Sequence, residues 1–292
     1  MRLLLAVAAA KSWHIHQLDV NDAFLHGFIN EGLYLQPPEE YYKALPGQVC
    51  KLKRFLYGLK QASRQWNIKF TCKLHQYGFI QSPHDPCLFT LSKGAIFLAL
   101  LVYVDDILLV GSSLDDLVLV KEFLHSQFTI KDLGQAHYFL GVELARSDTG
   151  LYLNQRKYVL DLLSDSGLTD CKLATTPLPR DAMFDLDSPL LHDADQFRRL
   201  VGQLLYLGFT RPDLSHAAQQ LSQFVQAPTD AHWSLALHVL RYLKGYPSKG
   251  LFFPVQPTLS ITGFCDADWV YCPLSLRSLT SYCVFRGSAL IS

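Results

Sequence analysis

The stretch IFLALLVYVDDILLV at residues 96–110 carries two adjacent carboxylates, Asp105 and Asp106, in the middle of strongly apolar sequence. Its two apolar parts, residues 96–104 and 107–110, predict buried strands on either side of the acidic pair. Buried carboxylates are costly unless a turn brings them to the surface or a cation compensates their charge. The pattern allows an Asp-Asp turn or a divalent-metal site, and the apolar flanks favour the metal site.

A third carboxylate, like the first two, lies beside an apolar segment that predicts a strand. Asp19 lies near the end of a predicted strand at residues 14–20, and Asp22, three residues later, is a candidate helix cap. Carboxylates at the ends of separate strands form a hard oxygen site, which suits magnesium. Two such ions can activate a 3′-hydroxyl and stabilise a pyrophosphate leaving group.

The composition of the chain excludes several classes of protein. The chain has 292 residues, of which 49% are hydrophobic and 18% charged, so it can bury a core and is not expected to be disordered. Lys plus Arg and Asp plus Glu each number 26, which excludes a chain-wide basic surface. The 7 cysteines form no Cys-x-x-Cys pair, which argues against a disulfide framework or a structural zinc site. The segment at 96–110 is too short and too acidic to span a membrane, so no membrane partner is expected.

Positive charge is nevertheless concentrated locally. Between residues 41 and 84 the chain has no Asp or Glu. We call the cations of this segment the basic block; they are Lys43, Lys51, Lys53, Arg54, Lys60, Arg64, Lys69 and Lys73. Aromatic residues such as Tyr57 and Trp66 lie between them, a combination that suits phosphates and stacked bases. The alternative is a solvated helix face above core aromatics.

The remaining pattern predicts a mixed α and β chain. Residues 1–10 indicate a first helix, with a signal peptide as the weaker alternative. The other predicted helices occupy 64–78, a segment capped by Ser112 or Ser113, a segment from the cap Asn154 to Gly167, 196–208, 212–226 and 229–244. Further strands are predicted at 137–144, 151–153, 259–265 and 282–285, and the Pro- and Asp-rich stretch 173–194 reads as a linker.

An ordered set of motifs resembles one family. LDVNDAFLHG at 18–27 is similar to motif A of reverse transcriptases, LYGLKQASRQW at 56–66 to the motif B region of copia-type enzymes, and YVDD at 103–106 to motif C. Further copia-type segments are YFLGVE at 138–143, NQRKY at 154–158, LVG at 200–202, TRPD at 210–213, LRYLKG at 240–245 and DADW at 266–269. The chain thus resembles the reverse transcriptase region of the Pol polyprotein of copia-type LTR retrotransposons, followed by the start of ribonuclease H.

This resemblance implies a role for each matching residue. Asp19, Asp105 and Asp106 would be catalytic and would hold two Mg²⁺ ions. Phe24 would be the gate under the sugar of the incoming nucleotide, favouring deoxynucleotides. The nucleotide would also meet Lys60 and Gln61, the primer and template would meet Tyr103, Val104 and Arg64, and Asp266 would be a ribonuclease H remnant.

The implied fold is α+β, with a right-hand polymerase palm. Its expected parts are the palm and start of the thumb at 1–172, a linker at 173–195, a helical connection region at 196–257 and a truncated ribonuclease H-like α/β segment at 258–292. The fingers are expected to be largely missing, and the family's other ribonuclease H carboxylates have no counterpart here. We therefore expect no ribonuclease H activity.

The implied function is RNA-directed DNA polymerisation, with an RNA template, a DNA primer and deoxynucleoside triphosphates as partners. Two alternatives remain open: a non-catalytic nucleic-acid-binding remnant that keeps the basic block, and a non-functional remnant of a decayed element. The expected location is intracellular, in the cytoplasm within a virus-like particle, with the nucleus as a second compartment.

Overall fold

The apolar stretch at 96–110 forms a β-hairpin, as its two halves predict. Strand β6 spans Ile96–Tyr103 and strand β7 spans Asp106–Gly111, with a two-residue turn between them. The computed structural model describes the whole chain except residues 28, 30, 39, 42–44, 46, 181, 183, 186, 257 and 270–277. The chain divides into two units, each treated by itself below.

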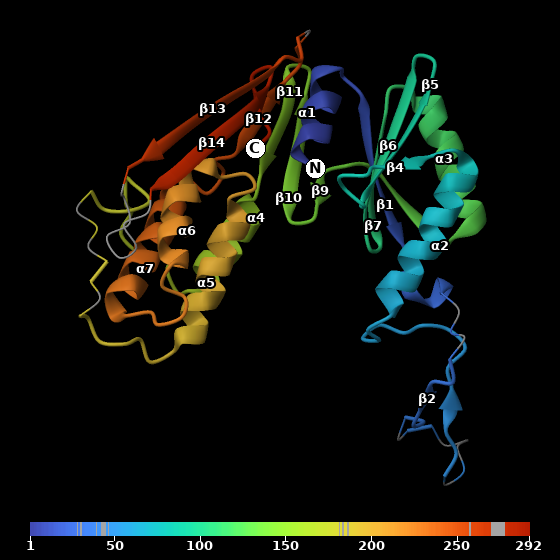
Figure 1. Ribbon diagram of the computed structural model, residues 1–292, viewed down its shortest axis with the longest axis horizontal. Helices are drawn as coiled ribbons and strands as arrows, with labels where there is room; N and C mark the ends of the chain where they lie inside the picture. The colour runs from blue at the N-terminus through green and yellow to red at the C-terminus, as the bar shows by residue number, and fades with distance from the viewer. Residues whose placement is uncertain are drawn as a thin grey trace. The chain divides into compact units, whose positions relative to one another are not determined.

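The first unit, Lys11–Ala136 with Met1, is built on a six-stranded antiparallel sheet (Figure 1). The strand order is β4-β5-β6-β7-β1-β8. The remaining strands of this sheet are β1 (His14–Val20), β4 (Ile80–Gln81), β5 (Leu88–Lys93) and β8 (Ile130–Gln135). A 3-10 helix, η1 (Ala23–His26), follows β1, and the short strands β2 (Tyr34–Leu35) and β3 (Cys50–Lys51) pair separately.

Two helices cover one face of this sheet, α2 (Ala62–Tyr77) and α3 (Leu114–Gln127) (Figure 1). Their buried residues are Ala62, Trp66, Phe70 and Leu74 from α2, and Leu117, Val120 and Leu124 from α3. Of the two candidate caps of α3, the structure selects Ser113, whose hydroxyl oxygen accepts the Asp116 N–H. Helix α2 ends at Gly78, whose φ of 113° suits glycine and whose N–H reaches back to the carbonyls of Leu74 and His75.

Strand alternation places the carboxylates away from these helices. Leu18 and Val20 of β1 belong to the core that packs against α2 and α3. Successive side chains of a strand point to opposite faces, so Asp19 lies on the other face of the sheet. On β7, Ile107 points to the core, and Asp106 therefore shares the face of Asp19.

The second unit comprises Arg2–Ala10 and His137–Ser292. Its four-stranded sheet has the order β12-β11-β10-β9, and helix α1 (Arg2–Ala10), predicted from the sequence, packs on β11 and β12. The bounds of these strands are β9 Tyr138–Phe139, β10 Val142–Ser147, β11 Gly150–Asn154 and β12 Leu251–Pro254. The single strand predicted at 137–144 is therefore wrong. Leu140 and Gly141, both at positive φ, break it into β9 and β10.

Helices build a second core in this unit. They are α4 (Arg156–Asp165), α5 (Ala194–Leu207), η2 (Pro212–Leu214), α6 (Ser215–Ser222) and α7 (Asp230–Gly245). The predicted helix at 212–226 is split, because its first turn is a 3-10 helix and the α-helix ends at Ser222. The cap of helix α4 is Gln155, one residue after the predicted Asn154, although the Asn154 side chain accepts the Arg156 N–H.

A third sheet in the second unit has the order β13-β14-β15. Strand β13 spans Ile261–Asp268, β14 spans Leu279–Arg286 and β15 spans Ala289–Leu290. The two strands predicted in this region are thus present and longer than predicted. All described residues of β13 are exposed.

Candidate functional site

Three adjacent strands of the first unit bring Tyr103, Asp106 and Asp19 into one row. In the β6–β7 hairpin Tyr103 pairs with Asp106, and in the β7–β1 pair Asp106 faces Asp19. Cross-strand partners share a face of the sheet with Cβ atoms about 4.5–5.5 Å apart. The two acids predicted from separate segments are therefore neighbours, with the exposed Tyr103 ring beside them.

Asp105 lies in the turn that precedes this row. Its carbonyl accepts the Val20 N–H at 2.9 Å, which ties the turn to the end of β1. The other turn residue, Val104, has a φ of 56°. A positive φ is rare for a β-branched residue, so the backbone that presents Asp105 is strained.

The three carboxylates repel one another. Burial raises the pKa of Asp106, the charges of Asp105 and Asp19 raise it further, and a hydrogen bond from the Gln17 side chain lowers it. Like charges that face each other across a strand pair destabilise a sheet. The arrangement therefore costs stability unless a cation compensates it.

Tyr57, which the motif-based assignment did not select, reaches this acidic corner. Its hydroxyl donates to Asp105 Oδ2 at 3.4 Å, and its ring lies 4.5 Å from that of Phe24 between centroids. Partial burial raises the pKa of the Tyr57 hydroxyl, and Asp105, Asp22 and Asp19 raise it further. Phe24 is thereby placed beside the carboxylates through Tyr57.

The segment that carries Phe24 is tied down by residues of the basic block. Arg54 Nη1 donates to the Leu25 carbonyl at 3.1 Å, and Lys69 Nζ donates to the His26 carbonyl at 2.7 Å. Two of the eight cations predicted to meet phosphates thus also hold the backbone of η1. Lys51, Lys53, Lys60 and Arg64 are exposed, and Lys43 lies outside the described residues.

Lys60, Gln61 and Arg64 lie exposed at the start of α2, where Gln61 is the cap residue. The interactions seen among the described residues do not join them to the three acids. Buried Trp66, in the next turn of α2, does reach the acidic turn, because its Nε1 donates to the Val104 carbonyl at 2.7 Å.

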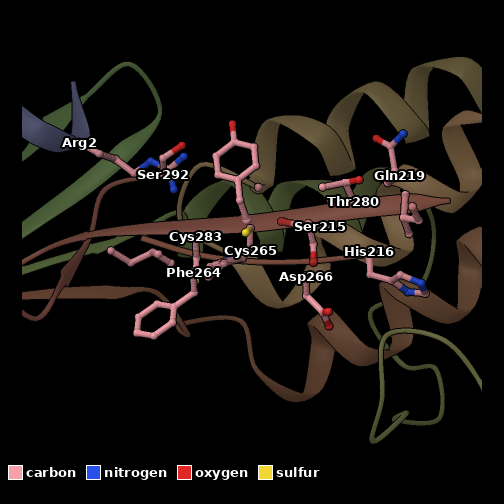
Figure 2. A pocket seen from close by; sticks show the side chains of 16 residues that line it. Arg2, Ser215, His216, Gln219, Phe264, Cys265, Asp266, Thr280, Cys283 and Ser292 are labelled. Atoms are coloured by element: carbon pink, nitrogen blue, oxygen red, sulfur yellow. The ribbon is translucent and has the colours of Figure 1, made fainter. Parts of the chain in front are cut away.

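Asp266 lies in the second unit, in a groove that is separate from the acidic site of the first unit. It lies on β13 and lines an open groove of about 760 Å³, with His216 and Gln219 of α6 also in the lining (Figure 2). Its neighbour on the chain, Asp268, is the last residue of β13. The two units thus hold separate candidate sites, and only the first unit gathers several predicted residues.

The donor chemistry of Asp19, Asp105 and Asp106 fits a hard divalent cation, since all three supply carboxylate oxygens and their repulsion would be relieved by positive charge. Within the described ranges, however, no group of three or more His, Cys, Asp or Glu side chains is close enough together to hold a metal ion. Holding one would require the carboxylates to turn toward each other.

In the part of the chain that the structure describes, no helix is both long enough and apolar enough to cross a membrane.

Comparison with known proteins gives a family for the site. Residues 1–180 match the family described as reverse transcriptase (RNA-dependent DNA polymerase). The chain is 42% identical over its full length to the retrovirus-related Pol polyprotein from transposon RE1 of Arabidopsis thaliana, and 34% identical over 99% of its length to that from transposon TNT 1-94 of Nicotiana tabacum. It spans only 20% and 23% of those two polyproteins.

A shorter relative is covered almost completely. The putative transposon Ty5-1 protein of Saccharomyces cerevisiae is 35% identical over 86% of this chain and 83% of its own length. The family match includes all three motifs of the acidic site, and the relatives extend the likeness across the second unit. The chain therefore belongs to the reverse transcriptase (RNA-dependent DNA polymerase) family, among the Pol proteins of copia-type retrotransposons.

Proposed function

We propose that the first unit carries the palm active site of an RNA-directed DNA polymerase. The observation that carries this proposal is the cross-strand pair of Asp19 and Asp106, with Asp105 in the adjoining turn. A protein gains nothing in stability from placing like charges opposite each other. Such a cluster is expected where the charges serve to bind cations.

In this proposal Asp19, Asp105 and Asp106 would hold two Mg²⁺ ions. The ions would supply activation of the primer 3′-hydroxyl and stabilisation of the pyrophosphate leaving group. The chain's own task is to keep the carboxylates in place on strands and a turn that are rigidly hydrogen-bonded. The Val20 N–H bond to the Asp105 carbonyl supports this.

The remaining residues divide between nucleotide and nucleic acid. Phe24, with Tyr57 packed on its ring, would form the floor under the sugar and exclude a 2′-hydroxyl. Exposed Lys60 and Gln61 would approach the nucleotide, and Arg64 the template, at the start of α2. Tyr103, exposed beside Asp106, and Val104 would lie at the primer end.

The proposed partners are an RNA template, a DNA primer and deoxynucleoside triphosphates. The proposed architecture is a palm and start of the thumb at 1–172, a linker at 173–195, a helical connection region at 196–257 and a ribonuclease H-like segment with Asp266 at 258–292. The proposed location is the cytoplasm, in a virus-like particle, with the nucleus as a second compartment.

Sugar selection tests this function. Purified chain is given a primer on an RNA template with magnesium and either deoxy- or ribonucleoside triphosphates, beside the Phe24→Val variant. We expect the unaltered chain to extend the primer with deoxynucleotides. In the variant, its preference for deoxynucleotides over ribonucleotides should fall at least about tenfold, which corresponds to a loss of about 1.36 kcal/mol of transition-state discrimination. Extension with an unchanged preference would refute the role of Phe24.

A second candidate function is nucleic-acid binding without turnover. It is favoured by the exposed basic residues Lys51, Lys53, Lys60 and Arg64, with exposed Tyr57 among them. Binding to an RNA–DNA duplex that weakens steeply with salt, from a chain that never extends the primer, would support this function over catalysis.

A further inference from the structure

The turn that carries Asp105 adopts a conformation that its sequence does not favour. A two-residue hairpin whose first turn residue has positive φ and whose second does not follows the pattern that normally selects glycine at the first position. Val104 occupies that position with a φ of 56°, and Asp105 is not at positive φ. The surrounding structure must therefore hold the turn in place.

The carbonyl oxygens of the two peptide groups flanking Asp105 each accept a hydrogen bond from another element. The Val104 carbonyl, before Asp105, accepts Trp66 Nε1 at 2.7 Å, and the carbonyl of Asp105 itself accepts the Val20 N–H at 2.9 Å. The first bond comes from helix α2 and the second from strand β1. Because the orientations of these peptide groups set the φ and ψ of Asp105, the two bonds together set the direction in which its side chain leaves the backbone.

The indole of Trp66 is itself fixed. Its side chain is 2% exposed, and its ring packs against Phe70 at 5.1 Å and Phe128 at 5.2 Å between centroids, with His26 at 5.8 Å. A donor held by packing on several sides keeps its hydrogen-bond direction. Helix α2 thus delivers a rigid N–H to one side of the acidic turn.

We propose that Trp66 is a positioning residue of the polymerase site: its indole N–H holds the Val104 carbonyl, and through it the strained turn that carries Asp105 beside Asp106 and the end of β1. The effect of Trp66 on catalysis rests on the proposed function. Its effect on the conformation of the turn rests on the hydrogen bond to the Val104 carbonyl alone. This hydrogen bond also gives α2 a task beyond offering Lys60, Gln61 and Arg64 to the substrates.

The test removes the N–H donor and keeps the packing. Trp66 is replaced by 3-benzothienylalanine, which has the shape of tryptophan with sulfur in place of the N–H, and separately by Trp66→Phe. Phe89→Leu is the matched control, because Phe89 is a buried ring of the same core whose ring contact is with His75 and not with Trp66. Amide hydrogen exchange is measured for Val20 at the turn and for Ala136, whose N–H binds Ile15 at the far end of β1.

Loss of the donor is expected to speed exchange of the Val20 amide roughly tenfold relative to that of Ala136, as for the loss of one net hydrogen bond. In primer extension kcat is expected to fall roughly fivefold to tenfold, with the KM for the nucleotide changed less than about twofold. Phe89→Leu is expected to change neither the ratio of the two exchange rates nor kcat. If Trp66 only fills the core, the benzothienyl chain should also leave both quantities unchanged.

The outcomes separate the two claims. Unchanged Val20 exchange in the benzothienyl chain, which retains the indole shape, overturns the inference whether or not the chain polymerises. Faster Val20 exchange with unchanged kcat in an active enzyme overturns the positioning role. If the unaltered chain does not extend a primer at all, the proposed function fails, and the exchange ratio alone decides whether Trp66 holds the turn.

Discussion

At the residue scale, the acidic site is a local violation of the rules that stabilise a sheet. Asp19 and Asp106 face each other across β1 and β7, and Asp105 adds a third negative charge at the turn. The pKa of Asp106 is raised by burial and by the other two acids. A raised carboxyl pKa means that the folded state loses stability as pH rises through that pKa, so near neutrality the charge of Asp106 opposes folding.

Removing this charge should therefore stabilise the metal-free protein. We expect Asp106→Asn to raise the free energy of unfolding at pH 7 by about 0.2–1 kcal/mol, the usual range for a cross-strand pair. Urea denaturation without magnesium measures it. Asp148→Asn, at an exposed position between β10 and β11, is the control and should stay within about 0.5 kcal/mol. A clear loss of stability in Asp106→Asn would contradict the account of repulsion.

In the second unit the buried Arg211 pairs with the partly exposed Asp213, and this pairing lowers the pKa of a carboxyl group instead of raising it. Arg211 is 1% exposed and donates through Nε and Nη2 to Asp213, which also accepts the Tyr242 hydroxyl. Burial alone would raise the pKa of Asp213, but hydrogen bonds from Arg211 and Tyr242 and the charges of Arg211 and Lys249 outweigh it and lower the pKa to about 2. The pair gives Arg211 and Asp213 of the TRPD motif a structural role.

We expect Asp213→Asn to destabilise the chain by about 3–5 kcal/mol at pH 7, because it leaves Arg211 buried without its counter-charge. A lowered carboxyl pKa gives stability that is complete above the unfolded value and is lost as pH falls through the folded one. The part due to ionisation should thus disappear between about pH 4 and pH 2. Denaturant unfolding over this pH range checks it, and a pH-independent difference would contradict the assignment.

At the element scale, the helix ends show which local signals the sequence carries. Ser113, one of the two predicted candidates, caps α3, and Thr229, predicted as the first residue of a helix, is the cap of α7 instead. The break between β9 and β10 is missed by the sequence prediction although Gly141 marks it, because a single glycine inside an apolar run does not by itself end a strand and Leu140 also adopts positive φ. The apolar pattern of residues 212–226 likewise does not predict that this segment divides into the 3-10 helix η2 and helix α6.

The cap of α7 offers a quantitative test. Thr229 Oγ1 accepts the His232 N–H and donates to the Asp185 carbonyl, while its own N–H binds the His232 ring at Nδ1. We expect Thr229→Ala to cost about 1–2 kcal/mol of unfolding free energy, and Thr229→Ser, which keeps the hydroxyl, to cost much less. Thermal and urea unfolding compare the two. Equal losses would assign the effect to the methyl group instead.

At the scale of the whole molecule, the sequence predicts each acid and its strand but not the contacts that join distant segments. Strand β1 follows from local alternation and the hairpin from two apolar runs, so the sequence alone selects Asp19, Asp105 and Asp106. The Tyr57 and Trp66 contacts to the turn span 48 and 38 residues of sequence, and no periodicity reveals them. For the same reason, the sequence does not predict that Arg54 and Lys69 of the basic block bind the backbone carbonyls of η1.

Among the described residues, the hydrophobic cluster around Leu100 and Leu109 in the first unit shares no member with the cluster around Leu204 and Val239 in the second. We expect Leu109→Ala to cost about 2–5 kcal/mol and to speed amide exchange chiefly in the first unit. Leu204→Ala should do the same in the second. Exchange that accelerates equally throughout the chain in both variants would contradict two separate cores.

The central claim is that Asp19, Asp105 and Asp106 form a magnesium-dependent polymerase site. The most direct measurement is single-nucleotide extension of a DNA primer on an RNA template by the purified chain, beside Asp105→Asn and the control Asp148→Asn. The account predicts extension that requires magnesium, persists in Asp148→Asn and is lost in a folded Asp105→Asn. Equal extension by Asp105→Asn, or none by a folded unaltered chain, would contradict it.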